Sequence, residues 1–221
     1  MEADSAMIIR AAAGCPVARV YEWSRPALSF PRSANLAKIR TSWLEESGIS
    51  VVRRPTGGGI LVHGWDLSFS VAVPGKHPAA AGSISAAGRL LASPVLEALC
   101  SMGYDVAFRE KESPAACGHV PGICFLQRSD LDIMMGKRKV AAFAQRRTSE
   151  VIFQHGSVEI EPFSEVLVEK LVQAGVGTKE DWSRVQDGTT WLDSVKPVDK
   201  AFLAGAIVRF TTAILGFAPA A

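Results

Sequence analysis

The stretch Arg53-Arg54-Pro55-Thr56-Gly57-Gly58-Gly59-Ile60-Leu61-Val62-His63 organises this chain. Three adjacent glycines leave main-chain N–H groups unshielded by side chains, and two arginines stand before them. Apolar residues at 49–52 and 60–62 predict a strand, a glycine-rich loop and a second strand. Backbone donors beside fixed positive charge suit an anionic or carbonyl-bearing ligand. A plain hairpin turn is the alternative, although such a turn needs fewer glycines.

The overall composition is that of one globular domain over residues 1–221, with 48% hydrophobic and 21% charged residues. A net charge of +2 gives no electrostatic case for nucleic acid, but it suits docking of an acidic carrier protein. The apolar runs are too short or too interrupted to cross a membrane. The loop lacks the spaced glycines of a dinucleotide site and the Lys-Ser/Thr ending of a phosphate-binding loop.

The cysteines indicate free thiols in a reducing cytoplasm, because they are scattered and no signal peptide precedes them. They are Cys15, Cys100, Cys117 and Cys124. Cys117 and Cys124 lie near His119, but their spacing matches no strong zinc pattern and a second ligand pair is missing. We therefore expect no metal site.

Periodicity predicts strands and helices in an irregular order. The expected helices are 1–13, 33–46, 79–102, 161–173 and 199–215. We expect the second helix to be capped by Ser33 or Asn35 and to stop at Gly48, and the third to be kinked or broken at Pro94. The expected strands are 17–23, 49–53, 60–63, 66–73, 106–108, 133–135, 139–145 and 151–159. Trp182 and Trp191, in a region of weak periodicity, should pack onto the domain. This order predicts an α+β fold on a mixed, mostly antiparallel sheet flanked by helices.

Three stretches together resemble the lipoate–protein ligase A and octanoyltransferase family. The glycine stretch, continued by Asp66-Leu67-Ser68-Phe69-Ser70, is similar to that family's signature. The segment 136–147 resembles its Gly-Arg-Lys-Ile-x-Gly-Ser-Ala-Gln motif, and Gln154-His155-Gly156-Ser157 resembles its His-Gly-Ser/Thr motif. The resemblance implies the biotin/lipoate ligase catalytic fold. The short turn at 63–66 points to the single-domain class that transfers octanoyl groups from a carrier protein to a protein.

The resemblance implies two catalytic residues. Lys139 matches the lysine that contacts the acyl carbonyl, and beside a thiol its amine can stabilise a thiolate and move protons. Cys124 begins a segment similar to the Cys-Phe-x-x-x-Ser of one octanoyltransferase class, in which the cysteine carries the acyl group. A buried, inert cysteine is the alternative for Cys124, and Cys117 is the competing thiol. Lys137 and Arg138 are interpreted as surface charge.

Further residues are expected to bind substrate on the same match: Arg53, Arg54, Thr56, Gly57, Gly58, Gly59, His63, Gln145, His155 and Gly156. Tyr21 and Trp23, in a stretch that resembles the family's Tyr-x-Trp-x-x-Pro-x-x-Ser, are either core aromatics or part of the pocket wall. The chain departs from the family at Pro31, Ala34 and Phe143, and Phe143 adds bulk that shortens the acyl pocket or alters the activity. The chain starts almost at the family's Met-x-x-Asp, so we expect a late start or a missing first strand.

Three functions follow from these residues. In the leading hypothesis, Cys124 takes an octanoyl or lipoyl group from an acyl carrier protein thioester. It then passes the group to a lysine of a lipoyl domain, in a 2-oxoacid dehydrogenase or the glycine cleavage H protein, without a cofactor. The second is a ligase that uses ATP and Mg²⁺ to form an acyl-adenylate, in which Cys124 has no chemical role. The third is a degenerate family member that only binds.

Overall fold

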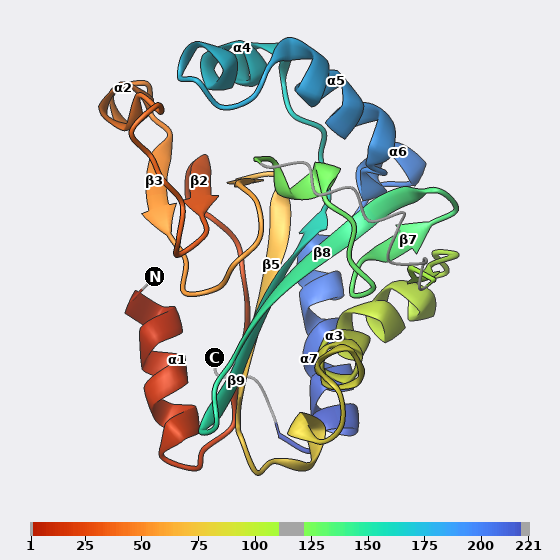
Figure 1. Cartoon of the computed structure of the whole chain (residues 1–221). Coiled ribbons are helices and arrows are strands. Elements are labelled where there is room, and N and C mark those ends of the chain that lie inside the picture. The colour runs from red at the N-terminus through yellow and green to blue at the C-terminus, as the bar shows by residue number, and fades with distance from the viewer. Residues whose placement is uncertain (1, 111–121, 218–221) are drawn as a thin grey trace.

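The computed structural model describes residues 2–110 and 122–217, which form helices packed around two β-sheets (Figure 1). The helices are α1 (Glu2–Ala12), α2 (Thr41–Glu46), α3 (Ile84–Ser101), α4 (Glu165–Gln173), α5 (Lys179–Gly188), α6 (Leu192–Val195) and α7 (Lys200–Leu215). The strands are β1 (Val17–Tyr21), β2 (Ala27–Phe30), β3 (Ser50–Arg53), β4 (Leu61–His63), β5 (Asp66–Pro74), β6 (Ala107–Phe108), β7 (Ile133–Met135), β8 (Arg138–Arg147) and β9 (Val151–Glu159). The 3₁₀ turns η1 (Pro78–Ala80) and η3 (Cys124–Leu126) also lie in the described residues.

The larger sheet has six strands in the order β1-β5-β9-β8-β7-β6, and every neighbouring pair is antiparallel. The smaller sheet has the order β3-β2-β4, with β2 parallel to β3 and antiparallel to β4. This arrangement confirms the predicted α+β fold on mostly antiparallel strands. The predicted strands are all present, but β2 was not predicted, because its four residues stand between Pro26 and Pro31 and show little alternation.

The two faces of the larger sheet have different partners. One face packs on α3 and α7, and the alternating side chains of β5 point into this core as predicted: Leu67, Phe69, Val71 and Val73. The opposite face is covered at one end by α1, whose Met7 and Ala11 pack on Val17 and Phe153. Figure 1 shows α1 on one side of the sheet and the pair α3 and α7 on the other. The rest of the α1 face is left for the glycine loop.

A second apolar cluster joins the smaller sheet to the helices that follow β9. Trp182 and Trp191 are buried in it, as predicted, and Ile123 and Phe125 from the η3 segment belong to the same cluster. Helix α5 itself was missed, since its apolar periodicity is weak; it begins at a capping box in which Thr178 and Asp181 exchange side-chain and main-chain hydrogen bonds. The helices after β9 therefore support the segment that carries Cys124.

The helix predicted over 33–46 is wrong in its first half, because only α2 is helical there. The Arg53 guanidinium accounts for the difference, since it donates hydrogen bonds to the carbonyl oxygens of Pro31, Arg32 and Ala34. In a helix capped at Ser33, the Ala34 oxygen would accept a helical N–H group, so Arg53 competes with the first turn at that residue. Neither predicted cap operates: the Asn35 side chain accepts from the Ala37 amide in a local turn. Gly48 stops the helix as expected, with φ of 84°.

Pro94 was expected to kink or break the helix over 79–102, and it lies inside α3, so the helix is not broken there. A proline cannot donate to the carbonyl four residues before it, here that of Leu90. The Ser93 hydroxyl donates to the Leu90 carbonyl oxygen at 2.7 Å, which satisfies that group. The helix starts at Ile84, later than predicted, where the Ser83 side chain accepts from the Ala86 amide.

Candidate active site

The glycine loop connects β3 to β4 and meets the main chain of the Cys124 segment. The Ile60 amide donates to the Gly122 carbonyl oxygen at 2.6 Å, and the Cys124 amide donates to the Ile60 carbonyl oxygen at 2.7 Å. These bonds form a short parallel bridge between Ile60 and Ile123. The structure thus brings together the two segments that the sequence selected separately.

Gly59 is required by this close approach. A Cβ at Gly59 would lie 2.6 Å from both the Cys124 nitrogen and the Gly122 carbonyl oxygen. Gly58 has φ of 94°, in the left-handed region that favours glycine. A Cβ at Gly57 would have no heavy atom within 4 Å. The three glycines therefore serve different purposes, and the position next to Cys124 is the one without room for a side chain.

A prediction follows from this difference between Gly59 and Gly57. Gly59→Ala is expected to cost about 1–3 kcal/mol or more of unfolding free energy, because main chain must shift to admit the methyl group. Gly57→Ala is the matched control and should stay within about 0.5 kcal/mol of the parent. Chemical denaturation measures both. Equal midpoints for the two variants would contradict the packing described here.

Arg54 lies buried beneath the loop and binds protein groups with its guanidinium. Nη1 donates to the Ser29 carbonyl oxygen at 2.8 Å and to the Ser29 hydroxyl at 3.2 Å. Nη2 donates to the carbonyl oxygens of Gly57 and Gly59, and Nε donates to the Thr56 hydroxyl. All five N–H groups of the side chain have acceptors. Arg54 therefore holds the loop in shape, and its charge still acts on the cavity above it.

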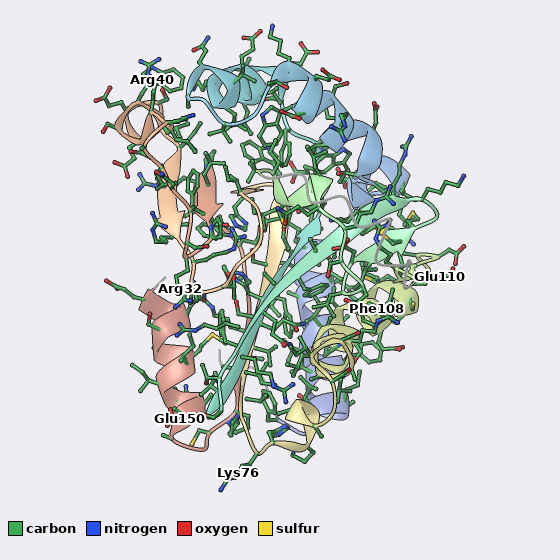
Figure 2. All side chains as sticks on the ribbon, viewed as in Figure 1. Arg32, Arg40, Lys76, Phe108, Glu110 and Glu150 are labelled. Atoms are coloured by element: carbon green, nitrogen blue, oxygen red, sulfur yellow. The ribbon has the colours of Figure 1, made fainter. Side chains whose placement is uncertain are left out.

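Electrostatics link Arg54 to Cys124. Burial lowers the pKa of the Arg54 guanidinium, and the thiolate form of Cys124 acts in the opposite direction. Arg53, in contrast, points to the 31–34 turn and is exposed. Figure 2 labels Arg32, one of the residues whose carbonyl oxygen Arg53 binds.

A cavity lies beside Cys124, between the larger sheet and the glycine loop. Its apolar wall includes Tyr21, Trp23 and Leu61. The structure thus places both aromatic residues of β1 and the turn after it on the pocket wall. His63 and His155 also line the cavity. A mostly apolar lining with a few polar side chains suits a small apolar group with a few polar contacts.

His63 and His155 each have defined partners. His63 Nδ1 lies 2.9 Å from Asp66 Oδ2, and its Nε2 lies 2.9 Å from the Ser29 hydroxyl. The His63 ring stacks on Trp23 with the centroids 4.3 Å apart. His155 Nε2 lies 2.7 Å from the Thr56 hydroxyl. Burial, with Arg54 adding to it, holds the pKa of His155 well below its usual value.

Gly156 is explained by its neighbour across the sheet. It pairs with Phe143 of β8, and a Cβ at Gly156 would collide with the Phe143 ring. Phe143 belongs to the apolar core with α3 and also lines the cavity. Glycine is therefore needed at 156 to admit the aromatic ring that stands at 143.

Lys139 lies buried on β8 and faces the Cys124 segment. Its Nζ donates to the Gln127 carbonyl oxygen at 2.6 Å and to the Cys124 carbonyl oxygen at 3.5 Å, and it pairs with Asp132 at 3.0 Å. Burial raises the pKa of Asp132, and Lys139 acts against that rise. The ammonium group thus binds both ends of the segment that begins at Cys124.

A second cleft, of about 230 Å³, lies on the Lys139 side. Gly57, Gly58 and Gln145 line it together with Lys139. The Gln145 amide donates to Gln154 at 2.9 Å. Cys124 lines this polar cleft as well as the apolar cavity. The predicted site residues therefore divide into two groups that meet at Cys124.

Sequence reasoning assigned no role to several buried polar residues of the site, although some of them stand inside the family-like motifs: Ser29, Asp66, Ser68, Asp132, Ser157 and Glu159. Asp66 accepts from His63, from the Gly64 amide, and from the hydroxyls of Ser68 and Ser157. Burial alone would raise the pKa of Asp66, but His63 and these hydrogen bonds outweigh it and bring the pKa below its usual value. The sequence signal for Asp66 and Glu159 was an acidic residue at the end of an otherwise largely apolar strand.

Glu159 is fully buried opposite Asp66, and burial followed by repulsion from Asp66 raises its pKa well above the usual value. The Ser157 hydroxyl lies 2.5 Å from Glu159 and 2.9 Å from Asp66. A hydroxyl has one proton to donate. If Ser157 donates to the ionised Asp66, Glu159 must be protonated and donate to Ser157.

Glu159→Gln is therefore expected to raise the melting temperature at pH 7.5 more than at pH 4.5. Below the pKa of Glu159 in the unfolded chain, the carboxyl is neutral in both states and the folded protein keeps its full stability. As the pH rises from there towards the raised pKa of the folded state, the unfolded chain ionises first, so the free energy of unfolding decreases. Glutamine is neutral at both pH values. Glu150→Gln, at the exposed β8–β9 turn labelled in Figure 2, is the control. A gain that does not depend on pH would contradict a protonated Glu159.

Among residues 2–110 and 122–217 no cluster of three metal-ligating side chains is present. Cys117 and His119 lie outside these ranges, so the zinc alternative and the competing thiol are not described. Cys15, Cys100 and Cys124 are free thiols. The helices of the described part include none that is long and apolar enough to cross a membrane.

Curated relatives share sequence with most of this chain. An octanoyltransferase LipM from Halalkalibacterium halodurans is 34% identical over 151 residues, which cover 66% of this chain and 55% of that protein. The LipM of Staphylococcus aureus is 33% identical over 148 residues, covering 65% and 54%. The LipM of Carboxydothermus hydrogenoformans is 28% identical over 203 residues, covering 87% and 74%. The match thus spans little more than half the length of the first two relatives.

Solved structures share the fold. A lipoate-protein ligase A crystal structure, described as bound with ATP, superposes with a TM-score of 0.73 at 19% identity, covering 98% of this chain and 80% of that one. A bi-partite lipoate protein ligase from Thermoplasma acidophilum gives 0.70 at 16% identity, covering 99% and 81%. The family model for the lipoyl protein ligase A/B catalytic domain matches residues 7–201. This chain therefore belongs to the lipoyl protein ligase A/B catalytic domain family.

Proposed function

We propose that this protein is an acyltransferase that moves an octanoyl or lipoyl group from a carrier-protein thioester to a lysine of a lipoyl domain. Cys124 is the nucleophile and holds the acyl group between the two steps. The observation that carries the proposal is the position of Cys124, which lines both the apolar cavity and the polar cleft. The names of the relatives support octanoyl transfer.

The first step exchanges one thioester for another. The Cys124 thiolate attacks the acyl carbonyl carbon, and the carrier thiolate leaves. The apolar wall at Tyr21 and Trp23 receives the acyl chain. This exchange is nearly balanced in energy and requires no ATP or metal ion.

The second step joins the acyl group to a lysine amine and produces a stable amide. The polar cleft at Gly57, Gly58 and Lys139 provides a route for the acceptor lysine to Cys124. Lys139 holds the carbonyl oxygens of Cys124 and Gln127, so its role is to position the nucleophile's segment. A lipoyl domain is the expected acceptor, and the Thermoplasma acidophilum structure is described as belonging to a lipoylation system of a bi-partite lipoate protein ligase and its E2 lipoyl domain.

The second candidate is an ATP-dependent lipoate–protein ligase. It is favoured by the fold shared with a ligase described as bound with ATP. In that reaction ATP and Mg²⁺ activate the free acid, and Cys124 is a wall residue. The two candidates differ in their acyl donor, which makes them separable in one experiment.

The test is an intact-mass assay of an apo lipoyl domain under two conditions. One reaction contains octanoyl carrier protein without ATP, and the other contains free octanoate or lipoate with ATP and Mg²⁺. We expect an acyl mass gain in the first reaction. A gain in the second reaction only would make the protein a ligase, and a gain in neither would favour the binding-only alternative.

A further inference from the structure

The arm of the donor must reach Cys124 through the polar cleft. This inference rests on the proposed function and concerns how its first step recognises the donor. In a thioester, the acyl chain and the sulfur are different substituents of the carbonyl carbon and point away from each other. When the chain occupies the apolar cavity, the arm that carries the sulfur extends into the other opening beside Cys124, which is the polar cleft. The side chains of this cleft therefore meet the arm.

Positive charge is concentrated around the polar cleft. Besides Cys124, its lining residues belong to three segments, 53–58, 127–132 and 137–147. These segments hold eight basic and two acidic residues, a net charge of +6, whereas the whole chain has +2, which leaves −4 for the rest. A cleft surrounded by one sign of charge raises the local concentration of ligands of the opposite sign. The expected ligand of this cleft is therefore an anion.

Arg128 lines this cleft four residues after the nucleophile, and its side chain is exposed. The main chain on both sides of it is held in place. The Gln127 carbonyl oxygen accepts from Lys139 at 2.6 Å, and the Ser129 amide donates to Asp132 at 2.9 Å. Lys139 and Asp132 form a buried ion pair with each other. The ion pair thus fixes the position from which the arginine side chain reaches into the cleft.

The separation between Cys124 and Arg128 suits the arm of an acyl carrier. Four residues span at most about 14 Å of extended chain, and the 3₁₀ turn at Cys124–Leu126 shortens this span. The arginine side chain adds reach of its own. A carrier arm is a phosphopantetheine group, in which two amide units separate the sulfur from a phosphate. The fixed anion of the arm and the fixed cation of the cleft are thus both set at a distance from the thioester.

We propose that Arg128 binds the phosphate of the phosphopantetheine arm and so selects phosphorylated thioester donors. A guanidinium presents parallel N–H donors to two phosphate oxygens, which gives orientation as well as affinity. With the phosphate at Arg128 and the chain in the apolar cavity, the thioester carbon lies at Cys124. After the exchange, the arm leaves with its sulfur as a thiolate, which takes a proton from water. The cleft is then open to the acceptor lysine.

The test uses two small donors, S-octanoyl-phosphopantetheine and S-octanoylpantetheine, which differ only in the phosphate. Intact mass follows the formation of acyl-Cys124. The parent should load the phosphorylated donor with a second-order rate constant about 10–100-fold higher, as expected for hydrogen bonds between charged groups. Arg128→Gln should load both donors at the rate that the parent shows with S-octanoylpantetheine. Arg128→Lys should keep part of the preference, because an ammonium supplies charge without the planar fork.

The matched control is Arg138→Gln, which removes an exposed arginine of the same positive segments that does not line the cleft. It should keep the preference for phosphate, and a loss equal to that of Arg128→Gln would show a diffuse field instead of a site. Loading with S-octanoylpantetheine checks the integrity of each variant. Phosphopantetheine also forms part of coenzyme A. Octanoyl carrier protein and octanoyl-coenzyme A are therefore compared, and dependence on Arg128 with either donor supports the phosphate site.

Equal loading of the two small donors by the parent would overturn the phosphate site and leave the acyl-enzyme intact. The site would also be overturned if Arg128→Gln loaded normally from the carrier but passed its acyl group slowly to the lipoyl domain. Arg128 would then belong to the surface that binds the acceptor. If the parent forms no acyl-Cys124 from any donor, the proposed function fails first and this inference fails with it.

Discussion

Replacing Cys124 with Ala is expected to abolish transfer from an acyl carrier protein, by at least roughly 10⁴-fold, because the reaction then lacks its nucleophile. The variant should fold normally, since Cys124 is half-buried at the edge of two clefts and Ala is smaller. Octanoylation of the lipoyl domain, followed by intact mass, measures the effect.

The control for this prediction is Cys15→Ala, which removes an exposed thiol far along the chain. It should transfer at the parent's rate. A Cys124→Ala protein that still transfers octanoate from the carrier would contradict the acyl-enzyme. A variant that fails with the carrier but attaches free lipoate with ATP would point to the ligase reaction.

Lys139→Ala is expected to cost both activity and about 3–5 kcal/mol of stability, as removal of one partner of a buried ion pair does. It leaves Asp132 buried without its nearest cation, although Arg109 lies 3.4 Å away and lessens the loss. It also frees the carbonyl oxygens of Cys124 and Gln127. Urea denaturation and the transfer assay give the two quantities.

The double variant Lys139→Met with Asp132→Leu separates these effects. With both charges removed, stability should recover relative to Lys139→Ala, while transfer should stay low because the Cys124 segment lacks its anchor. Lys137→Ala, at the exposed turn between β7 and β8, is the control for loss of a lysine. Full activity in Lys139→Ala would contradict the role given to this residue.

The strands could be predicted from the sequence because their side chains alternate between two different environments. Along β5 the residues at 67, 69, 71 and 73 enter the core, and the alternation records this directly. The helix over 33–46 failed because Arg53, distant in sequence, takes the carbonyl oxygens of the 31–34 turn. Local propensity carries no information about such a partner.

The site residues could be selected by motif, but their contacts could not. The glycines were expected to offer N–H groups to a ligand, whereas Gly57 and Gly59 direct their carbonyl oxygens to Arg54. Asp132, the partner of Lys139, and Asp66, the partner of His63, gave only the signal of an acidic residue near an apolar strand. These pairings depend on how the two sheets meet.

The most direct test of the account is to isolate the acyl-enzyme. The protein is mixed with octanoyl carrier protein in the absence of ATP, quenched in acid, and digested for peptide mass mapping. We expect one octanoyl group, on Cys124, that disappears when apo lipoyl domain is added before the quench. An octanoyl group on another residue, or transfer to the lipoyl domain with no acylated Cys124 at any time, would contradict it.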